Sequence, residues 1–368
     1  MSIPGRDAEV IDRHARCAEA MLAAGKDGAL LLDSANITWL TAGMQMPVIA
    51  DPAEAPALFY LERQRWLLCS NVDTQRLFDE DLNDLGFQVK EWQWFLGRHT
   101  LLYGLSNGRP LASDSSFNGC TNLADTFRQL RRTRSPWDQE RMRELGKAVA
   151  HAIEATCRNC ERGDTEQEIA GQLSHRLIRH GITPVSIQVA VDGRLRSYRR
   201  VGCTETRLEQ GCVIRATGQK HGLHATASRA VSIGPPDTTF RREYDLACKA
   251  MGVYVTACKP GESVAAATSV GTKFLEHHGH GDEWRLAPIG WVTGTAPVEL
   301  AFTPSTSDTI QPNWAIVWSP SVGASLVADT YLVESTGLQC VTPAEMWPLK
   351  RLKLPNATID CPDILARN

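Results

Sequence analysis

The strongest local signal in this sequence of 368 residues is a pair of consecutive amphipathic helices near its middle. Ser135 is a good N-cap and Pro136 is well tolerated at the first helical position, so the first helix is expected to begin there. Its apolar residues recur every three or four positions and mark one face: Met142, Leu145, Val149, Ile153 and Cys157. Thr165 and Glu168 have the spacing of a capping box, which predicts a second helix that ends before Gly181.

Upstream of this pair, short apolar runs alternate with helical patterns, which predicts an α/β domain. The expected elements are a helix over 8–24, strands over 28–33, 57–61 and 65–69, a helix over 73–84 and a strand near 87–90. The arginine-rich stretch 128–134, directly before Ser135, indicates the domain boundary.

Downstream of the pair the pattern changes to strands followed by helices. The expected elements are strands over 187–191, 212–217 and 222–229, helices over 240–258 and 262–277, and closing strands over 315–318 and 328–333. The turn at 218–221 predicts an antiparallel hairpin between the second and third of these strands. The sequence contains no tandem repeat.

Composition limits the function classes. The formal net charge is −3, which argues against non-specific nucleic-acid binding, because that binding depends on neutralising phosphates. No apolar run has the length of a membrane helix, and Met1–Val10 lacks the pattern of a signal peptide. Eleven cysteines include a single C-x-x-C, Cys157–Cys160, without the second pair that a structural zinc site needs. We therefore expect reduced thiols in a cytoplasmic protein, with no nucleic-acid or membrane partner.

The order of these elements resembles that of the creatinase/prolidase superfamily, which includes aminopeptidase P and methionine aminopeptidase. Residues 36–43 (NITWLTAG) resemble its N-x-x-Y-L-T-G segment, and 163–168 (GDTEQE) resemble its G-x-T-E-x-E segment. The resemblance implies an α/β (α+β) fold: a small N-terminal creatinase-like α/β domain over 1–134, a C-terminal pita-bread domain over 135–345 and a C-terminal tail over 346–368. It also implies a homodimer.

Members of that superfamily hold a pair of divalent metals with two Asp, one His and two Glu, and the metals activate a bridging water. The corresponding residues in this sequence are, in chain order, Thr217 (or Arg215 if the hairpin is not shortened), Thr226, Trp291, Ser319 and Ala328. None of these side chains is a carboxylate or an imidazole, so we expect no metal and no other cofactor. Flanking residues of the superfamily motifs are retained, which indicates a surviving scaffold: Gly290, Gly294, Glu299, Pro320, Arg229, Asp329 and Thr330.

If a pocket remains, the resemblance gives it one candidate catalytic residue, Glu299. A carboxylate partly desolvated beside aromatic rings has a raised pKa and could act as a general acid or base. The alternative is an ion pair between Glu299 and Arg199 or Arg229. The candidate substrate-binding residues are Tyr198, Arg199, Arg200, Thr217, His224, Thr226, Trp291, Trp318 and Ser319.

Two of these candidates are adjacent arginines, Arg199 and Arg200, which could clamp a carboxylate or phosphate. Successive strand residues face opposite ways, so at most one of the two is expected to point inward. His221 and His224, three positions apart on a predicted hairpin, would lie on opposite faces and form a poor metal pair. For both histidines a surface position is the alternative to a place in the pocket.

Three functions stay open at this point. The first is a metal-independent hydrolase of a C–N bond in a small polar amide, amino acid or guanidino compound, as creatinase is. Arg200 stands near the position of creatinase's essential His, which argues against creatine itself as substrate, because a guanidinium does not exchange protons near neutral pH. The second is a catalytically inactive pseudo-peptidase that binds a small molecule, a peptide or a protein. The third and weaker one is a metallopeptidase with rearranged ligands.

Overall fold

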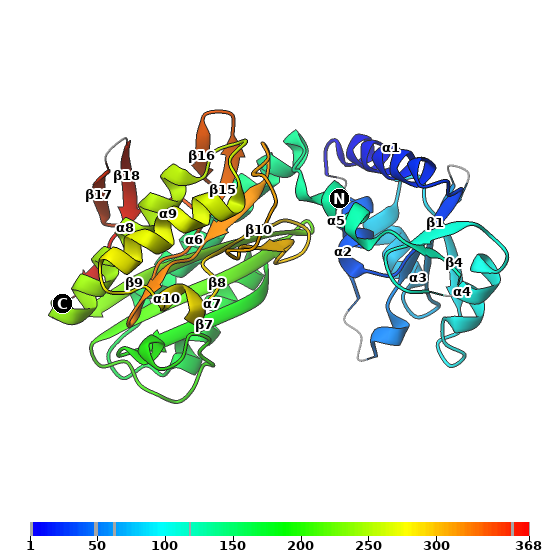
Figure 1. The fold of residues 1–368 in the computed structure, drawn as a ribbon. Helices are drawn as coiled ribbons and strands as arrows, with labels where there is room; N and C mark the ends of the chain where they lie inside the picture. Colours follow the sequence, from blue (N-terminus) through cyan, green and yellow to red (C-terminus); the bar gives the residue numbers. More distant parts are fainter. Residues whose placement is uncertain (1–2, 48–50, 62–63, 118, 355–356, 368) are drawn as a thin grey trace. The chain divides into compact units, whose positions relative to one another are not determined.

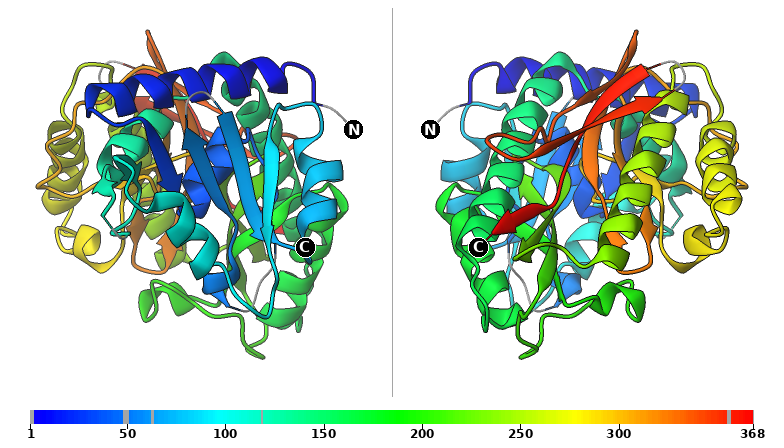
Figure 2. Two further views of the ribbon diagram at one scale, coloured as in Figure 1. Left: turned by 90° about the vertical axis from the view of Figure 1, so that its right-hand side faces the viewer. Right: turned by 90° about the vertical axis from the view of Figure 1, so that its left-hand side faces the viewer.

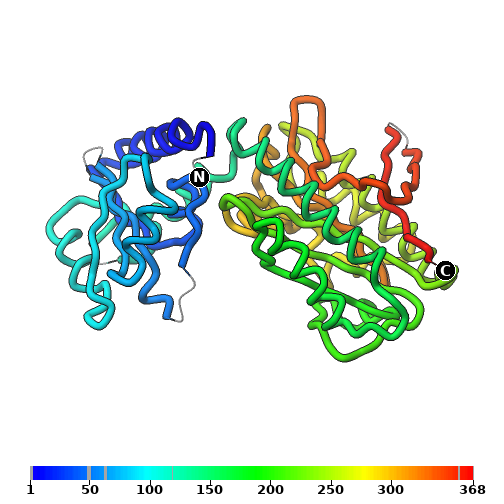
Figure 3. Tube along the Cα trace, turned by 180° about the vertical axis from the view of Figure 1, so that it is seen from behind, coloured from blue at the N-terminus to red at the C-terminus, as the bar shows by residue number. Residues whose placement is uncertain are grey.

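The computed structural model describes residues 3–47, 51–61, 64–117, 119–354 and 357–367. The chain divides into two compact units, Met1–Arg132 and Thr133–Asn368, and Figures 1 and 3 trace it through one unit and then the other. Among the described residues, the helices are too short or too polar to cross a bilayer.

The first unit is built on a six-stranded sheet in the order β4-β3-β2-β1-β5-β6, whose strands Figure 2 shows side by side. The strands are β1 (Gly28–Leu31), β2 (Ala57–Leu61), β3 (Gln64–Ser70), β4 (Gln88–Trp92), β5 (Leu111–Ser113) and β6 (Thr121–Asn122). β2 runs antiparallel to both its neighbours, and the other pairs are parallel. The core of this unit includes Leu30, Phe59, Leu68 and Leu102.

Helices and short helical turns surround this sheet. They are α1 (Arg6–Ala23), α2 (Ser34–Leu40), η1 (Pro52–Glu54), α3 (Thr74–Arg76), the π-helical turn η2 (Leu77–Leu82), α4 (His99–Ser106) and α5 (Ala124–Arg132). The predicted α/β domain is confirmed, as are its first helix and four strands. The helix predicted over 73–84 is confirmed over 74–82, where one α-helical turn continues as a wider π-helical turn.

The two helices at the start of the second unit form as the sequence predicts. They are α6 (Pro136–Asn159) and α7 (Glu166–Arg179). Ser135 Oγ accepts a hydrogen bond from the Asp138 amide at 3.1 Å. Thr165 and Glu168 form the reciprocal capping box.

The second unit contains two larger sheets. The first has the order β19-β9-β8-β7 and the second the order β11-β10-β12-β15-β16. The strands of the first are β7 (Thr183–Val191), β8 (Gly211–Lys220), β9 (Leu223–Ile233) and β19 (Leu365–Arg367). Those of the second are β10 (Gly290–Thr293), β11 (Leu300–Ala301), β12 (Ala315–Trp318), β15 (Asp329–Glu334) and β16 (Gly337–Cys340).

Each of these sheets has its own helical cover and its own core. α6 lies against β8 and β9, where Val149, Ile153 and Ile214 are buried together. α8 (Thr238–Ala257) and α9 (Val264–His277) pack on the second sheet, with Tyr254 and Trp318 in their shared core. The remaining short elements are η3 (Arg194–Arg196), α10 (Glu283–Leu286), and the two-stranded ribbons β13 (Ser321–Val322) with β14 (Ser325–Leu326) and β17 (Leu349–Leu354) with β18 (Ala357–Pro362).

The hairpin between β8 and β9 turns later than predicted. β8 continues to Lys220, and the tight turn consists of His221 and Gly222, with φ angles of 51° and 72°. Left-handed backbone at both central residues is the geometry that matches the twist of a two-residue hairpin. This register places Thr217 directly opposite Thr226.

The predicted C-terminal tail, residues 346–368, contains three short strands among its described residues. β17 and β18 pair with each other and pack on α8, and β19 runs parallel to β9 at the edge of the first sheet. These strands therefore pack within the second unit. The sequences of these short strands mix polar and apolar residues without a regular alternation. They are therefore recognisable as strands only from their pairing with a neighbouring strand.

A buried arginine joins three elements of the second unit. The Arg229 guanidinium on β9 donates to Glu154 on α6 and to Asp329 on β15, each at 3.0 Å, and to the Thr342 carbonyl at 2.9 Å. All three charged side chains are at most 2% exposed. The helix layer and both sheets therefore depend on one guanidinium.

We predict that Arg229→Met lowers the free energy of unfolding of the second unit by about 3–5 kcal/mol, because it leaves two buried carboxylates without their cation. Urea denaturation followed by circular dichroism measures this change. The control is Arg143→Met, which removes an exposed ion pair with Glu334 and should cost at most about 1 kcal/mol. Equal effects of the two substitutions would contradict the proposed role of Arg229.

Candidate functional site

Two of the residues mapped to the superfamily's metal positions, Thr226 and Ala328, lie at the line where β9 meets β15. Ser228 and Ala328 exchange hydrogen bonds there: the Ser228 amide donates to the Ala328 carbonyl at 2.8 Å, and the Ala328 amide donates to Ser228 Oγ at 2.7 Å. Thr330 Oγ1 accepts from the Thr226 amide and donates to the Thr226 carbonyl, both at 2.8 Å. We call the six mapped residues the seam site: Arg215, Thr217, Thr226, Trp291, Ser319 and Ala328.

Strand alternation puts these side chains on facing surfaces. Arg215 and Thr217 are two residues apart on β8, and Thr217 pairs with Thr226 on β9, so all three share one face. The two threonine hydroxyls are 2.8 Å apart and buried. The two hydroxyls therefore satisfy each other's hydrogen-bonding capacity. They stand at the positions where the superfamily is expected to have metal-binding carboxylates.

The Arg215 side chain lies over the indole of Trp291, with its Cζ atom 5.2 Å from the ring centroid. Burial and, to a smaller extent, the nearby charge of Arg200 lower the pKa of this guanidinium to about 10. No carboxylate of the described residues lies within ion-pair distance of Arg215. The seam site therefore contains a partly buried cation without a counter-charge, still protonated at neutral pH.

Two hydroxyl groups on the second sheet are also uncommitted. Ser319 Oγ and Thr293 Oγ1 are both buried and have no hydrogen-bond partner among the residues that the structure describes. Trp291 and Thr293 are alternate residues of β10, so they project from the same face. An oxygen atom of a ligand next to this face would satisfy these hydroxyls.

The retained glycines of the superfamily motif have structural reasons to be glycine. A Cβ at Gly290 would lie 2.6 Å from Cε3 of Trp318, and a Cβ at Gly294 would lie 2.8 Å from Cζ of Arg134. Larger residues would thus displace a core indole and a buried guanidinium. These two positions support the fold whether or not the seam site has chemistry.

Glu299 is buried, and its Oε1 accepts a hydrogen bond from the Ala296 amide at 2.8 Å. The carboxylate is therefore held against its own turn. The alternative ion pair with Arg199 or Arg229 is not formed: Arg199 donates to Glu283 at 2.6 Å, and Arg229 belongs to the buried network described above. The structure leaves a catalytic role for Glu299 as a prediction.

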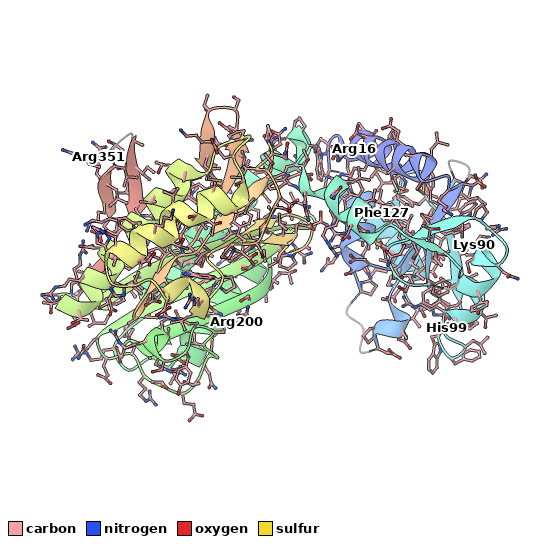
Figure 4. All side chains as sticks on the ribbon, in the orientation of Figure 1. Arg16, Lys90, His99, Phe127, Arg200 and Arg351 are labelled. Atoms are coloured by element: carbon pink, nitrogen blue, oxygen red, sulfur yellow. The ribbon has the colours of Figure 1, made fainter. Side chains whose placement is uncertain are left out.

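The other expected pocket residues are Tyr198, Arg199, Arg200 and Trp318. Tyr198 is 57% exposed, and Arg199 ties its loop to α10 and to the Gly323 carbonyl. Arg200, labelled in Figure 4, is exposed but close enough to act on the charge of Arg215. Trp318 points to the opposite face of its sheet and stacks on Tyr254 at 4.7 Å, because strand alternation separates it from Ser319.

His224 is buried, so the alternative of a surface position is wrong for this residue. Its Nδ1 lies 2.9 Å from the Gly294 carbonyl oxygen, so Nδ1 carries the proton in this contact. Burial lowers the pKa of His224 to about 4, and the imidazole is neutral at physiological pH. Its two-residue spacing from Thr226, on the face that carries the seam site, was the sequence signal for this burial.

We predict that His224 makes stability depend on pH. Its pKa falls from 6.5 in the unfolded chain to about 4 on folding, so the folded state binds fewer protons in this interval. The contribution is complete above pH 6.5 and is lost as pH falls toward 4; between pH 7 and pH 5 the loss is about 2 kcal/mol. Urea unfolding of His224→Asn should lack this part of the pH dependence, while His175→Asn, on exposed α7 surface, should keep it. If the free energy of unfolding of the wild type and of His224→Asn changed with pH in the same way, the prediction would be wrong.

The seam site does not have the donors of a divalent metal site. It offers a guanidinium, an indole, a methyl group and three hydroxyls, whereas hard divalent metals take carboxylate and imidazole ligands. Over the described parts of the chain, no group of three or more His, Cys, Asp and Glu could hold a metal ion.

Comparison with known proteins places these features in a family. Residues 140–334 match the sequence profile of metallopeptidase family M24. The Xaa-Pro dipeptidase of Pyrococcus furiosus is 20% identical over 232 residues, which cover 61% of this chain and 66% of that protein. The probable dipeptidase PepE of Mycobacterium tuberculosis is 21% identical over 231 residues, which cover 58% of this chain and 59% of the PepE sequence. The chain thus spans less than two thirds of the length of these curated relatives.

Solved structures show the fold over most of the chain. Dipeptidase PepE from Mycobacterium ulcerans has a TM-score of 0.76 at 18% identity and covers 92% of this chain and 96% of its own. The prolidase from Pyrococcus horikoshii has a TM-score of 0.78 at 15% identity, and the match covers 91% of this chain and 99% of the prolidase chain. The N-terminal domain of FACT complex subunit SPT16 from Cicer arietinum has a TM-score of 0.68 at 11% identity, and the match covers 92% of this chain and 96% of the SPT16 chain. The predicted fold, an N-terminal α/β domain followed by a pita-bread domain, is confirmed.

Proposed function

This chain belongs to metallopeptidase family M24, and we propose that it is a metal-free member whose seam site binds an anionic ligand instead of hydrolysing a peptide bond. One observation carries this proposal: the Arg215 guanidinium, stacked on Trp291, occupies the side of the site where the superfamily's first metal-binding Asp is expected. A fixed positive charge there repels a divalent cation and attracts an anion.

The chemistry of the site favours a carboxylate as the bound group. A guanidinium presents paired N–H donors whose spacing fits the two oxygens of a carboxylate, and aromatic stacking holds its plane. The uncommitted hydroxyls of Ser319 and Thr293 can donate to the same ligand. Small acids and peptides with a free carboxylate are therefore the proposed ligand class, in a pseudo-peptidase that binds without cleaving.

The metal-independent hydrolase that the sequence left open is the second candidate. It would need Glu299 as acid or base, but the Glu299 carboxylate is held by the Ala296 amide within its own turn. The neutral His224 is bound to the Gly294 carbonyl through Nδ1. We therefore favour binding without hydrolysis, because Arg215 and the uncommitted hydroxyls of Ser319 and Thr293 supply groups that bind a ligand.

We predict that the purified protein contains no stoichiometric manganese, cobalt, iron or zinc, because the seam site lacks carboxylate and imidazole donors. Elemental analysis measures the content, and added Mn²⁺ should leave the melting temperature unchanged. A catalytically active M24 metallopeptidase treated in the same way is the positive control. One or two metal ions per chain, together with Xaa-Pro dipeptide hydrolysis, would overturn the proposal in favour of rearranged ligands.

We predict opposite effects of Arg215→Met on stability and on binding. Without ligand, the variant should gain about 1–2 kcal/mol, because the cost of a desolvated guanidinium exceeds the cation–π contact that is lost. With ligand, it should lose the rise in melting temperature that N-acetyl amino acids and dipeptides cause in the wild type.

The matched control for this experiment is Arg179→Met, an exposed arginine on α7, which should retain the ligand-induced rise. The C-terminally amidated form of each ligand tests the carboxylate, and it should have no effect on the wild type. A response to the amides equal to that of the acids, or a response that persists in Arg215→Met, argues against carboxylate binding at Arg215.

A further inference from the structure

A groove of 1280 Å³ in the second unit, away from the seam site, is lined by positive charge. It runs along α8, α9, β16 and the β17–β18 ribbon, which Figure 1 shows next to α8. Its basic lining residues are Lys249, Lys259, Lys273, Lys350, Arg351 and Lys353, and His277 and His278 also line it. None of its described lining residues is Asp or Glu. We call this feature the basic groove.

Most of this charge is not compensated within the protein. Lys350 pairs with Asp245, and Arg351 pairs with Asp360 at 3.3 Å. Among the described residues, the other four lysines of the basic groove have no carboxylate within ion-pair distance. Four such lysines around one groove, in a chain with a net charge of −3, form a local excess that an anionic partner would neutralise.

Apolar side chains form the rest of the lining. Val253, Phe274, Leu352 and Ile359 are partly or fully buried there, and Val270 is 49% exposed. A groove that only held solvated lysines would not need these apolar side chains in its lining. The lining therefore suits a partner that brings both acidic and apolar side chains.

The basic groove also contains part of a sheet edge. Gly337 and Leu338 of β16 line it, and β16 is the last strand of the five-stranded sheet. An edge strand directs half of its backbone N–H and C=O groups away from its neighbour. An extended peptide can pair with such an edge and place alternate side chains to either side.

From charge, apolar lining and strand edge together, we infer that the basic groove docks an extended segment of a partner protein in which acidic and apolar residues alternate. Its lysines would bind the carboxylates, and its floor would bury the apolar side chains. A nucleic acid fits less well, because it would leave the aliphatic floor uncovered and find a single aromatic ring, Phe274, beside two imidazoles for base stacking among the described lining residues. No residue of the groove belongs to the seam site, so this inference does not depend on the proposed function.

The test is fluorescence polarisation with the full chain and a short fluorescein-labelled peptide that alternates Glu with Leu and Val. We expect saturable binding that weakens as salt is added, because the contacts are charged and lie at the surface. Lys273→Glu combined with Lys353→Glu should weaken it about tenfold or more, because two attractions become repulsions. The matched control replaces Lys90 and Lys147, two exposed lysines that do not line the groove, by Glu and should leave the affinity unchanged.

Two further probes decide the chemistry. A peptide with Ser in place of Leu and Val should bind more weakly than the amphipathic one, and a single-stranded oligonucleotide of equal length should also bind more weakly. The inference is overturned if the oligonucleotide binds more tightly than the amphipathic peptide. It is overturned equally by the absence of saturable peptide binding, or by peptide binding that the Lys273/Lys353 reversal does not change.

Discussion

The second unit depends on Arg229, whose buried guanidinium connects α6, β9 and β15 through Glu154 and Asp329. Burying one cation between two carboxylates is costly, and only complete pairing offsets that cost. The pairing fixes β15 against β9, and the backbone bonds between Ser228 and Ala328 follow from that alignment. Thr226 and Ala328 of the seam site take their positions from this junction.

This dependence explains which superfamily residues the chain keeps. Arg229 and Asp329 hold the junction, Thr330 bonds to the Thr226 backbone, and Gly290 makes room for Trp318. Each has a packing or hydrogen-bonding role without any metal. Among the positions mapped to metal ligands, Thr226 and Ala328 also form hydrogen bonds across this junction, and none of the mapped side chains is a carboxylate or an imidazole.

Arg215 gives the seam site a positive charge. Carboxylate-rich sites are stabilised by cations, and we propose that an anion neutralises Arg215. Thr217 and Thr226 bond to each other and need no ion. The proposed carboxylate binding and the docking surface at the basic groove both follow from uncompensated positive charge, at two separate places in one unit.

The sequence alone determined the elements whose signals are local. The Ser135 cap, the Thr165–Glu168 capping box and the α/β order of the first unit were predictable, because propensity and periodicity act over a few residues. The absence of carboxylates and imidazoles at the mapped positions was visible for the same reason: residue type at a motif position needs no tertiary contact.

Only the tertiary structure decided which side chains meet. It placed the hairpin turn at His221–Gly222, buried His224, turned Trp318 toward Tyr254 and paired β19 with β9. A shift of one residue in strand register moves a side chain to the opposite face, and single-sequence patterns do not fix that register. The stacking of Arg215 on Trp291, which gives the site its charge, joins residues 76 positions apart and could be seen only after the two sheets were brought together.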